Sequence, residues 1–123
     1  MLPILLILST VYTKIIVKRE DSVLEYNSKF EKLLNKDYIV ILYKSRCPYS
    51  LNTIKTLTDK KIPFTKYERS QNPELSTYAN KKYNYTKSPL IVIGGKFFGG
   101  DSTLQDAFEN DPQFLSWPNV REF

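Results

Sequence analysis

The strongest hydrophobic run in the sequence covers residues 38–43, Tyr-Ile-Val-Ile-Leu-Tyr. A run without polar alternation predicts a strand covered on both faces, as in the centre of a parallel sheet. Before it, apolar residues recur at the spacing of one helix face: Val23, Tyr26, Phe30, Leu33 and Leu34. Because Ser22 and Glu25 also have the form of a capping box, we expect a helix over residues 22–35.

After this run the pattern predicts a second helix, from Pro48 to about residue 60, and then a strand over residues 64–68. The apolar face of that helix is expected to consist of Leu51, Ile54 and Leu57. Two parallel strands joined by a helix form a right-handed unit. In open sheets built from such units, ligands bind at the carboxyl ends of the strands, so the segment before Pro48 is where a site is expected.

A third helix is predicted over residues 73–84. Pro73 suits the first helical turn, and Asn84 tolerates the left-handed conformation that ends a helix. Its inward side is expected to consist of Leu75, Tyr78, Ala79 and Lys82.

A hairpin and a fourth helix complete the pattern. Residues 90–93 and 96–98 flank the pair Gly94-Gly95, which is a strong hairpin signal. Asp101 and Ser102 are then expected to cap a helix that ends near residue 110.

Composition limits the chemistry. The 123 residues are enough for one domain with a sizeable core. The net charge of +5 comes from scattered lysines and arginines, so a solvated surface is favoured over nucleic-acid binding. One cysteine and no histidine exclude an intramolecular disulfide, a zinc site built from Cys and His, and a Ser-His-Asp or Cys-His catalytic group.

The single cysteine, Cys47, lies where the central strand gives way to a helix. A lone cysteine is usually a small buried hydrophobe, but this context is different. Pro48 at the first helical turn leaves Cys47 at the cap, where free N–H groups and the helix dipole favour a thiolate. Because Lys44 and Arg46 add positive charge, we expect Cys47 to be acidic, exposed and nucleophilic.

Three motifs resemble those of the glutaredoxins: Lys-x-x-Cys-Pro-Tyr at residues 44–49, Ser88-Pro89, and Gly-Gly-Asp-Ser at residues 99–102. The resemblance covers about residues 26–110. It implies an α/β thioredoxin fold, in which helices flank a central four-stranded mixed sheet, here with an extra N-terminal helix. Ser50 stands where the Cys-Pro-Tyr-Cys members have a second cysteine, so the chain resembles the monothiol members of the Cys-Pro-Tyr-Ser type.

The resemblance implies a glutathione-dependent thiol-disulfide oxidoreductase. Cys47 would take the glutathionyl group from a mixed disulfide, and a second glutathione would act as the resolving thiol because Ser50 cannot. Ser50 either donates a hydrogen bond to the thiolate or is merely tolerated. The residues that the resemblance assigns to glutathione binding are Lys44, Tyr49, Ser88, Pro89, Gly100, Asp101 and Ser102.

These residues would contact different parts of glutathione. Lys44 would pair with its glycine carboxylate, and the ring of Tyr49 would lie beside the tripeptide. Ser88, before a cis Pro89, would offer its backbone to the cysteinyl group. The γ-glutamyl end would bind the free N–H groups of residues 100–102. Many relatives have Asp at the position of Thr103, so contact with the α-amino group would shift to Asp101 or weaken.

Two other functions stay open. In one, two chains form a homodimer around a [2Fe-2S] cluster, which needs four thiolates: Cys47 from each chain and two glutathione thiols. In the other, the chain is a redox-silent adaptor with the same fold. The enzyme is expected to be a monomer that acts on glutathionylated proteins.

The first residues, 1–13, are apolar and uncharged, which suggests a signal peptide or a membrane anchor. Basic residues follow this run and do not precede it, which disfavours translocation, and an N-terminal strand or apolar tail is the alternative. We expect a linker over residues 14–21 and a glutaredoxin domain over residues 22–123, with residues 111–123 as a tail without assigned chemistry. A signal peptide would place the domain in the secretory lumen, where the sequon at Asn84 would matter; the alternative location is cytoplasmic.

Overall fold

The computed structural model describes residues 24–116. The chain divides into two compact units, Met1–Lys32 and Leu33–Phe123, and the whole sheet lies in the second. The expected signal or anchor segment 1–13, the linker 14–21 and the capping residue Ser22 lie outside the described residues. Within residues 24–116, no helix combines the length and the apolar character needed to cross a bilayer.

Residues 24–34 are helical, so the extra N-terminal helix is present. Tyr26 and Phe30, one turn apart, meet edge to face with ring centroids 4.6 Å apart. Phe30 and Leu34 are buried, whereas Tyr26 is half exposed. The expected apolar face is therefore buried only in part.

The sheet has four strands in the order β2-β1-β3-β4. The central strand β1 (Ile39–Tyr43) pairs with β2 (Thr65–Glu68) in parallel and with β3 (Leu90–Ile93) antiparallel. At the edge, β4 (Lys96–Gly99) runs antiparallel to β3. The sheet is thus mixed, as expected, and its central strand is the hydrophobic run identified in the sequence.

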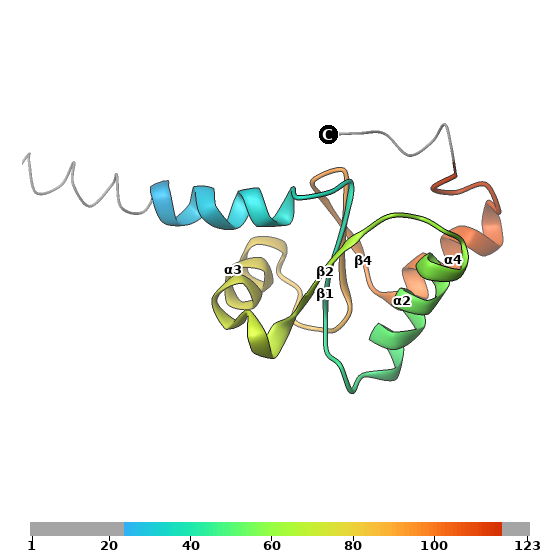
Figure 1. The fold of residues 1–123 in the computed structure, drawn as a ribbon, viewed down its shortest axis with the longest axis horizontal. Coiled ribbons are helices and arrows are strands. Elements are labelled where there is room, and N and C mark those ends of the chain that lie inside the picture. The colour runs from blue at the N-terminus through green and yellow to red at the C-terminus, as the bar shows by residue number, and fades with distance from the viewer. Residues whose placement is uncertain (1–23, 117–123) are drawn as a thin grey trace, which may run out of the picture. The chain divides into compact units, whose positions relative to one another are not determined.

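Helices cover both faces of this sheet. Figure 1 shows α3 (Pro73–Tyr83) on one side, and α2 (Pro48–Asp59) and α4 (Asp101–Asn110) on the other. A short 3-10 helix, η1 (Arg69–Gln71), follows β2 and was not predicted. The order of strands and helices agrees with the sequence prediction and with the thioredoxin fold that the resemblance implies.

The main core lies between the sheet and the α2–α4 layer, and includes Ile39, Ile41, Leu57, Ile91, Leu104 and Phe108. Part of the expected tail joins it. Leu115 is buried in this cluster, and the ring of Phe114 stacks on Phe98 with centroids 5.5 Å apart. Phe114 and Leu115 therefore help to close the core.

The buried face of α2 differs from the prediction. Leu51 is 50% exposed, whereas Ser50, Thr53 and Leu57 are buried. Apolar periodicity could not identify this face because two of its three residues are hydroxyl side chains. Both hydroxyls have hydrogen-bond partners outside α2, which offsets the cost of burying them.

Candidate functional site

Cys47 is the N-cap residue of α2, with φ −91° and ψ 118°, and its side chain is half-buried. The loop before it is held by hydrogen bonds at both ends. The Cys47 N–H donates to the Lys44 carbonyl at 3.1 Å, and the Ser45 N–H donates to Glu68 Oε1 at 3.4 Å. Leu51 N–H then donates to the Cys47 carbonyl at 3.1 Å, which begins the helix. The predicted position of Cys47 at the helix cap is confirmed.

The pKa of Cys47 is lowered, as expected for a nucleophilic thiol. The largest cause is the backbone N–H of Ser50; burial opposes it, and the Ser50 hydroxyl, the Tyr49 N–H and the charge of Lys44 add to it. Arg46 is exposed and is not among these causes, so the expectation that it would lower the pKa is wrong. Helix N–H groups close to the sulfur lower the pKa of a thiol more strongly than a solvated cation does.

Ser50 is built into this arrangement. Its side chain is fully buried, and its Oγ accepts a hydrogen bond from the Lys44 N–H at 3.2 Å. The same hydroxyl lowers the pKa of Cys47. These contacts favour the first of the two roles expected for Ser50, a hydrogen bond to the thiolate, over mere tolerance.

The segment facing Cys47 is Ser88-Pro89, and its peptide bond is cis, as the resemblance implied. The Cys47 thiol donates to the Ser88 carbonyl oxygen at 3.5 Å. Pro89 is fully buried, and the Ser88 hydroxyl is a buried polar atom without a hydrogen-bond partner in the described residues. The structure therefore brings Cys47 together with Ser50 and the Ser88-Pro89 segment.

The start of α4 corrects one expectation. Gly100, not Asp101, is the N-cap residue. The carboxylate of Asp101 is buried against α2, where it accepts hydrogen bonds from Thr53 Oγ1 at 2.7 Å and from Asn52 Nδ2 at 3.0 and 3.2 Å. Gln105 Nε2 donates to the same carboxylate at 3.1 Å. The Asp101 side chain therefore joins two helices, and only its backbone remains at the helix start.

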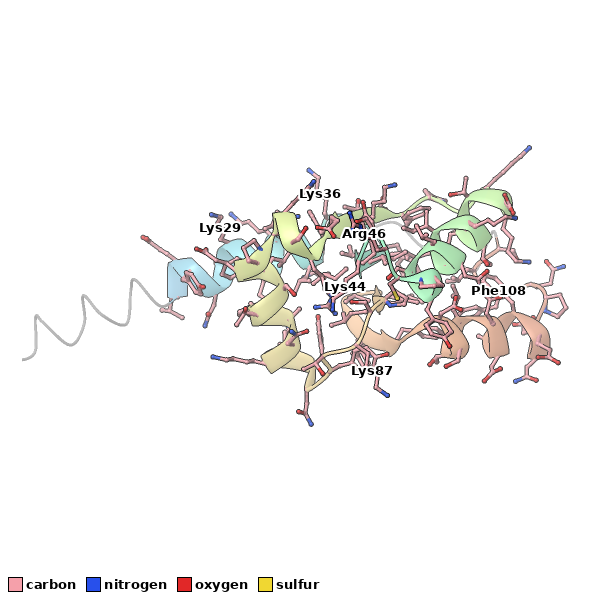
Figure 2. The ribbon with its side chains drawn as sticks, turned by 90° about the horizontal axis from the view of Figure 1, so that it is seen from below. Lys29, Lys36, Lys44, Arg46, Lys87 and Phe108 are labelled. Atoms are coloured by element: carbon pink, nitrogen blue, oxygen red, sulfur yellow. The ribbon has the colours of Figure 1, made fainter. Side chains whose placement is uncertain are left out.

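A cavity of about 590 Å³ lies next to the Cys47 loop. Lys44 and Arg46, labelled in Figure 2, line it from the loop, while Glu68 and Arg69 line it from the end of β2 and from η1. Thr86 and residues of α3 also line it. Its volume is in the range of small-molecule sites, and three cations among its lining residues suit an anionic ligand.

Arg69 is a site residue that the sequence analysis missed. Its side chain is only 6% exposed, and its guanidinium donates to Ser76 Oγ at 2.8 Å, Asn80 Oδ1 at 2.9 Å and the Lys87 carbonyl at 2.7 Å. Its Nε has no partner among the described residues. The available signal was topological, because Arg69 directly follows the strand parallel to β1 and so lies at the same sheet edge as Cys47.

The remaining predicted residues lie near the surface. Tyr49 is 67% exposed at the start of α2, Lys44 is exposed on the loop, and Ser102 is exposed in the first turn of α4. Within residues 24–116, the side chains of these three residues make no hydrogen bond to another predicted site residue, although the charge of Lys44 acts on Cys47.

Cys47, a cysteine of lowered pKa, thus lies at a helix start after the central strand β1 and faces the Ser88-Pro89 segment that precedes β3. The chain belongs to the glutaredoxin family, whose profile matches residues 39–98. It is 36% identical over 77 residues to a probable glutaredoxin of Acanthamoeba polyphaga mimivirus, covering 53% of this chain and 72% of the relative.

Two further comparisons extend this result. The chloroplastic monothiol glutaredoxin S14 of Arabidopsis thaliana is 29% identical over 84 residues, and the match covers 64% of this chain and 49% of that protein. The chain thus spans about half the length of this relative. The structure of a buckwheat glutaredoxin-glutathione complex superposes with a TM-score of 0.68 at 18% identity, covering 83% of this chain and 98% of that one. At that identity the likeness shows the fold.

Proposed function

We propose that this chain is a monothiol glutaredoxin, which uses Cys47 to reduce mixed disulfides between glutathione and proteins. The observation that carries this proposal is the Cys47 thiol itself. It lies at the start of α2 with a lowered pKa and faces the Ser88 carbonyl oxygen at 3.5 Å. The thiolate is the nucleophile that disulfide exchange needs, and a lowered pKa raises the fraction of thiolate at a given pH.

In the first step, the Cys47 thiolate attacks the glutathione sulfur of the mixed disulfide. A disulfide bond forms between Cys47 and glutathione, the bond between glutathione and the protein breaks, and the protein thiolate leaves and takes up a proton. Backbone N–H groups at the start of α2 stabilise the attacking thiolate, and the Ser50 hydroxyl adds to them.

In the second step, the thiolate of another glutathione attacks the glutathione sulfur on Cys47. Oxidised glutathione forms, and the Cys47 thiolate is released. Ser50 has no thiol and Cys47 is the only cysteine of the chain, so no internal disulfide can compete with this step. This is the basis for proposing the monothiol mechanism.

Glutathione carries a carboxylate at each end. In this proposal, cationic side chains bind one carboxylate and backbone N–H groups bind the other. Lys44 and Arg69, which line the cavity beside Cys47, would bind the glycine carboxylate. The free N–H groups of Asp101 and Ser102 at the start of α4 would bind the γ-glutamyl end. The Ser88 backbone would contact the cysteinyl group, and the exposed ring of Tyr49 would cover the tripeptide. The buckwheat relative was solved in complex with glutathione, which supports this ligand.

The cluster-binding homodimer needs more than one chain. Cys47 supplies one thiolate of the four that a [2Fe-2S] cluster needs, so the residues of one chain do not fit the cluster by themselves. The redox-silent adaptor would not need the lowered pKa of Cys47.

The test is an assay of glutathione-dependent reduction of a small glutathionylated disulfide by the full chain, purified without oxygen. We expect fast turnover by a colourless monomer and none by Cys47→Ser. Visible absorption and elution size are recorded on the same samples. A brown dimer with little turnover, colourless after Cys47→Ser, would favour the cluster alternative, and a colourless protein without turnover would favour the adaptor.

A further inference from the structure

The hydroxyl of Tyr85 lies over the start of α4. A β-carbon on Gly100 would be 2.6 Å from Tyr85 Oη and 3.5 Å from the Pro89 carbonyl oxygen. Since real β-carbons do not approach a polar atom so closely, the absence of a side chain at Gly100 is what gives the hydroxyl its place. Tyr85 Oη is therefore next to the N-cap residue of the helix whose N–H groups are proposed to bind the γ-glutamyl end.

Aromatic contacts hold the Tyr85 ring in this position. The ring packs on Phe97 of β4 with centroids 4.9 Å apart, and Phe97 in turn stacks on Tyr83 at 5.7 Å. Within residues 24–116 the Tyr85 hydroxyl makes no hydrogen bond. The ring is thus positioned by packing, while the hydroxyl is left available.

Tyr85 also lies close to the backbone segment that faces Cys47. Cys47 contacts the Ser88 carbonyl, and the next carbonyl, that of Pro89, lies beside Gly100 and Tyr85. Tyr85 therefore lies at the start of α4, beside the segment that faces Cys47.

In the first turn of α4, the polar side chains of Asp101 and Thr103 make contacts within the protein. The Asp101 carboxylate is directed to α2. The Thr103 side chain lies against Gly99, since a β-carbon there would be 2.5 Å from Thr103 Oγ1. Hydrogen-bond donors for a ligand at this helix start are therefore backbone N–H groups, the exposed Ser102 and the Tyr85 hydroxyl.

We infer that Tyr85 is a specificity-determining residue, whose hydroxyl donates a hydrogen bond to the α-carboxylate at the γ-glutamyl end of glutathione. This inference rests on the proposed function. A carboxylate held by helix N–H groups and by a packed phenol favours γ-glutamyl thiols over thiols that lack this carboxylate.

The test compares Tyr85→Phe with Tyr83→Phe in the full chain. Both variants remove one hydroxyl and keep a ring on Phe97, but only Tyr85 has its hydroxyl over Gly100. Binding is measured by NMR titration in the Cys47→Ser background, where no disulfide exchange occurs, with reduced glutathione and with 4-aminobutanoyl-Cys-Gly, which lacks the α-carboxylate. Turnover is measured with Cys47 intact.

We expect Tyr85→Phe to weaken glutathione binding about tenfold, to raise the KM for glutathione similarly and to leave kcat unchanged. Binding of the analogue should not change, and Tyr83→Phe should bind both ligands normally. If Tyr85→Phe binds glutathione as tightly as its parent, or loses affinity for both ligands equally, this inference is wrong while the proposed function stands. If the parent neither binds nor turns over glutathione, both are wrong.

Discussion

Thr53 Oγ1 donates a 2.7 Å hydrogen bond to Oδ1 of Asp101, and both side chains are buried. This bond joins α2, which begins at Cys47, to α4, which begins at Gly100. Asn52 and Gln105 donate to the same carboxylate from the two helices. The two helix starts that form the proposed site are thus held together by one polar group.

Replacing Asp101 should therefore destabilise the fold. Asp101→Ala leaves three donors without their acceptor, including the buried Thr53 hydroxyl, so we expect the free energy of unfolding to fall by about 2 kcal/mol. Asp101→Asn, which keeps one acceptor oxygen, should cost less. Urea unfolding measures both. Asp106→Ala, an exposed position on the same helix, is the matched control and should have little effect. An equal loss in the Asp106 variant would show that the effect belongs to the helix rather than to this contact.

The causes of the lowered Cys47 pKa predict an order among three variants. Ser50→Ala removes a hydroxyl that lowers the pKa, Lys44→Met removes a weaker charge contribution, and Arg46→Met removes an exposed cation that does not contribute. The pKa should therefore rise most in Ser50→Ala, less in Lys44→Met and not in Arg46→Met. It should stay below that of a free cysteine in all three because the Ser50 N–H remains. Thiolate absorbance near 240 nm as a function of pH measures these values; a larger rise in Arg46→Met than in Ser50→Ala would contradict the order.

The same lowered pKa makes stability depend on pH. Between the pKa of Cys47 in the folded chain and the ordinary value of about 8.5, the unfolded chain binds more protons than the folded one. The free energy of unfolding therefore rises with pH across this window, and the contribution is lost as pH falls through the folded pKa. Relative to Cys47→Ser, which does not titrate, the reduced wild type should gain stability as pH rises from 5 to 9. Urea unfolding under reducing conditions tests this, and parallel curves for the two proteins would count against it.

Much of the fold could be predicted because its elements have strong local signals. The β1 run, the Gly94-Gly95 turn and the left-handed Asn84 at the end of α3 each act within a few residues, and each is found as expected. Cys47 could be placed for the same reason, since Pro48 fixes the helix start next to it. Local backbone preferences are readable from a single sequence.

What could not be predicted depends on contacts between distant segments. The Asp101 side chain looked like a helix cap because its partners in α2 are about fifty residues away in the sequence. Arg69 looked like part of a connection, and its burial follows from partners in α3 and before β3. Thr53 is polar and so was not part of the apolar face predicted for α2, yet it is buried. Each becomes a site or core residue only through tertiary hydrogen bonds, which hydrophobic periodicity does not record.

The last prediction concerns the close approach of the Tyr85 hydroxyl to Gly100 at the start of α4. At Gly100, φ is −115°, which any residue adopts, so Gly100→Ala should be costly only because its β-carbon meets the Tyr85 hydroxyl. We expect a loss of about 1–3 kcal/mol in the free energy of unfolding. In the Tyr85→Phe background, the nearest ring atom would be 3.8 Å from that β-carbon, an ordinary contact, and most of the loss should disappear.

Gly99→Ala is the control for this double-mutant cycle. Gly99 has φ +146°, and its β-carbon would meet Thr103, not Tyr85, so Tyr85→Phe should not relieve its cost. Urea unfolding of the single and double variants gives the coupling energy between positions 85 and 100. A coupling energy near zero would mean that the Tyr85 hydroxyl does not lie over Gly100, and it would remove the geometric basis for assigning Tyr85 to the γ-glutamyl end. A coupling energy that is large for Gly100 and absent for Gly99 would place the hydroxyl at the helix start, where a ligand carboxylate can reach it.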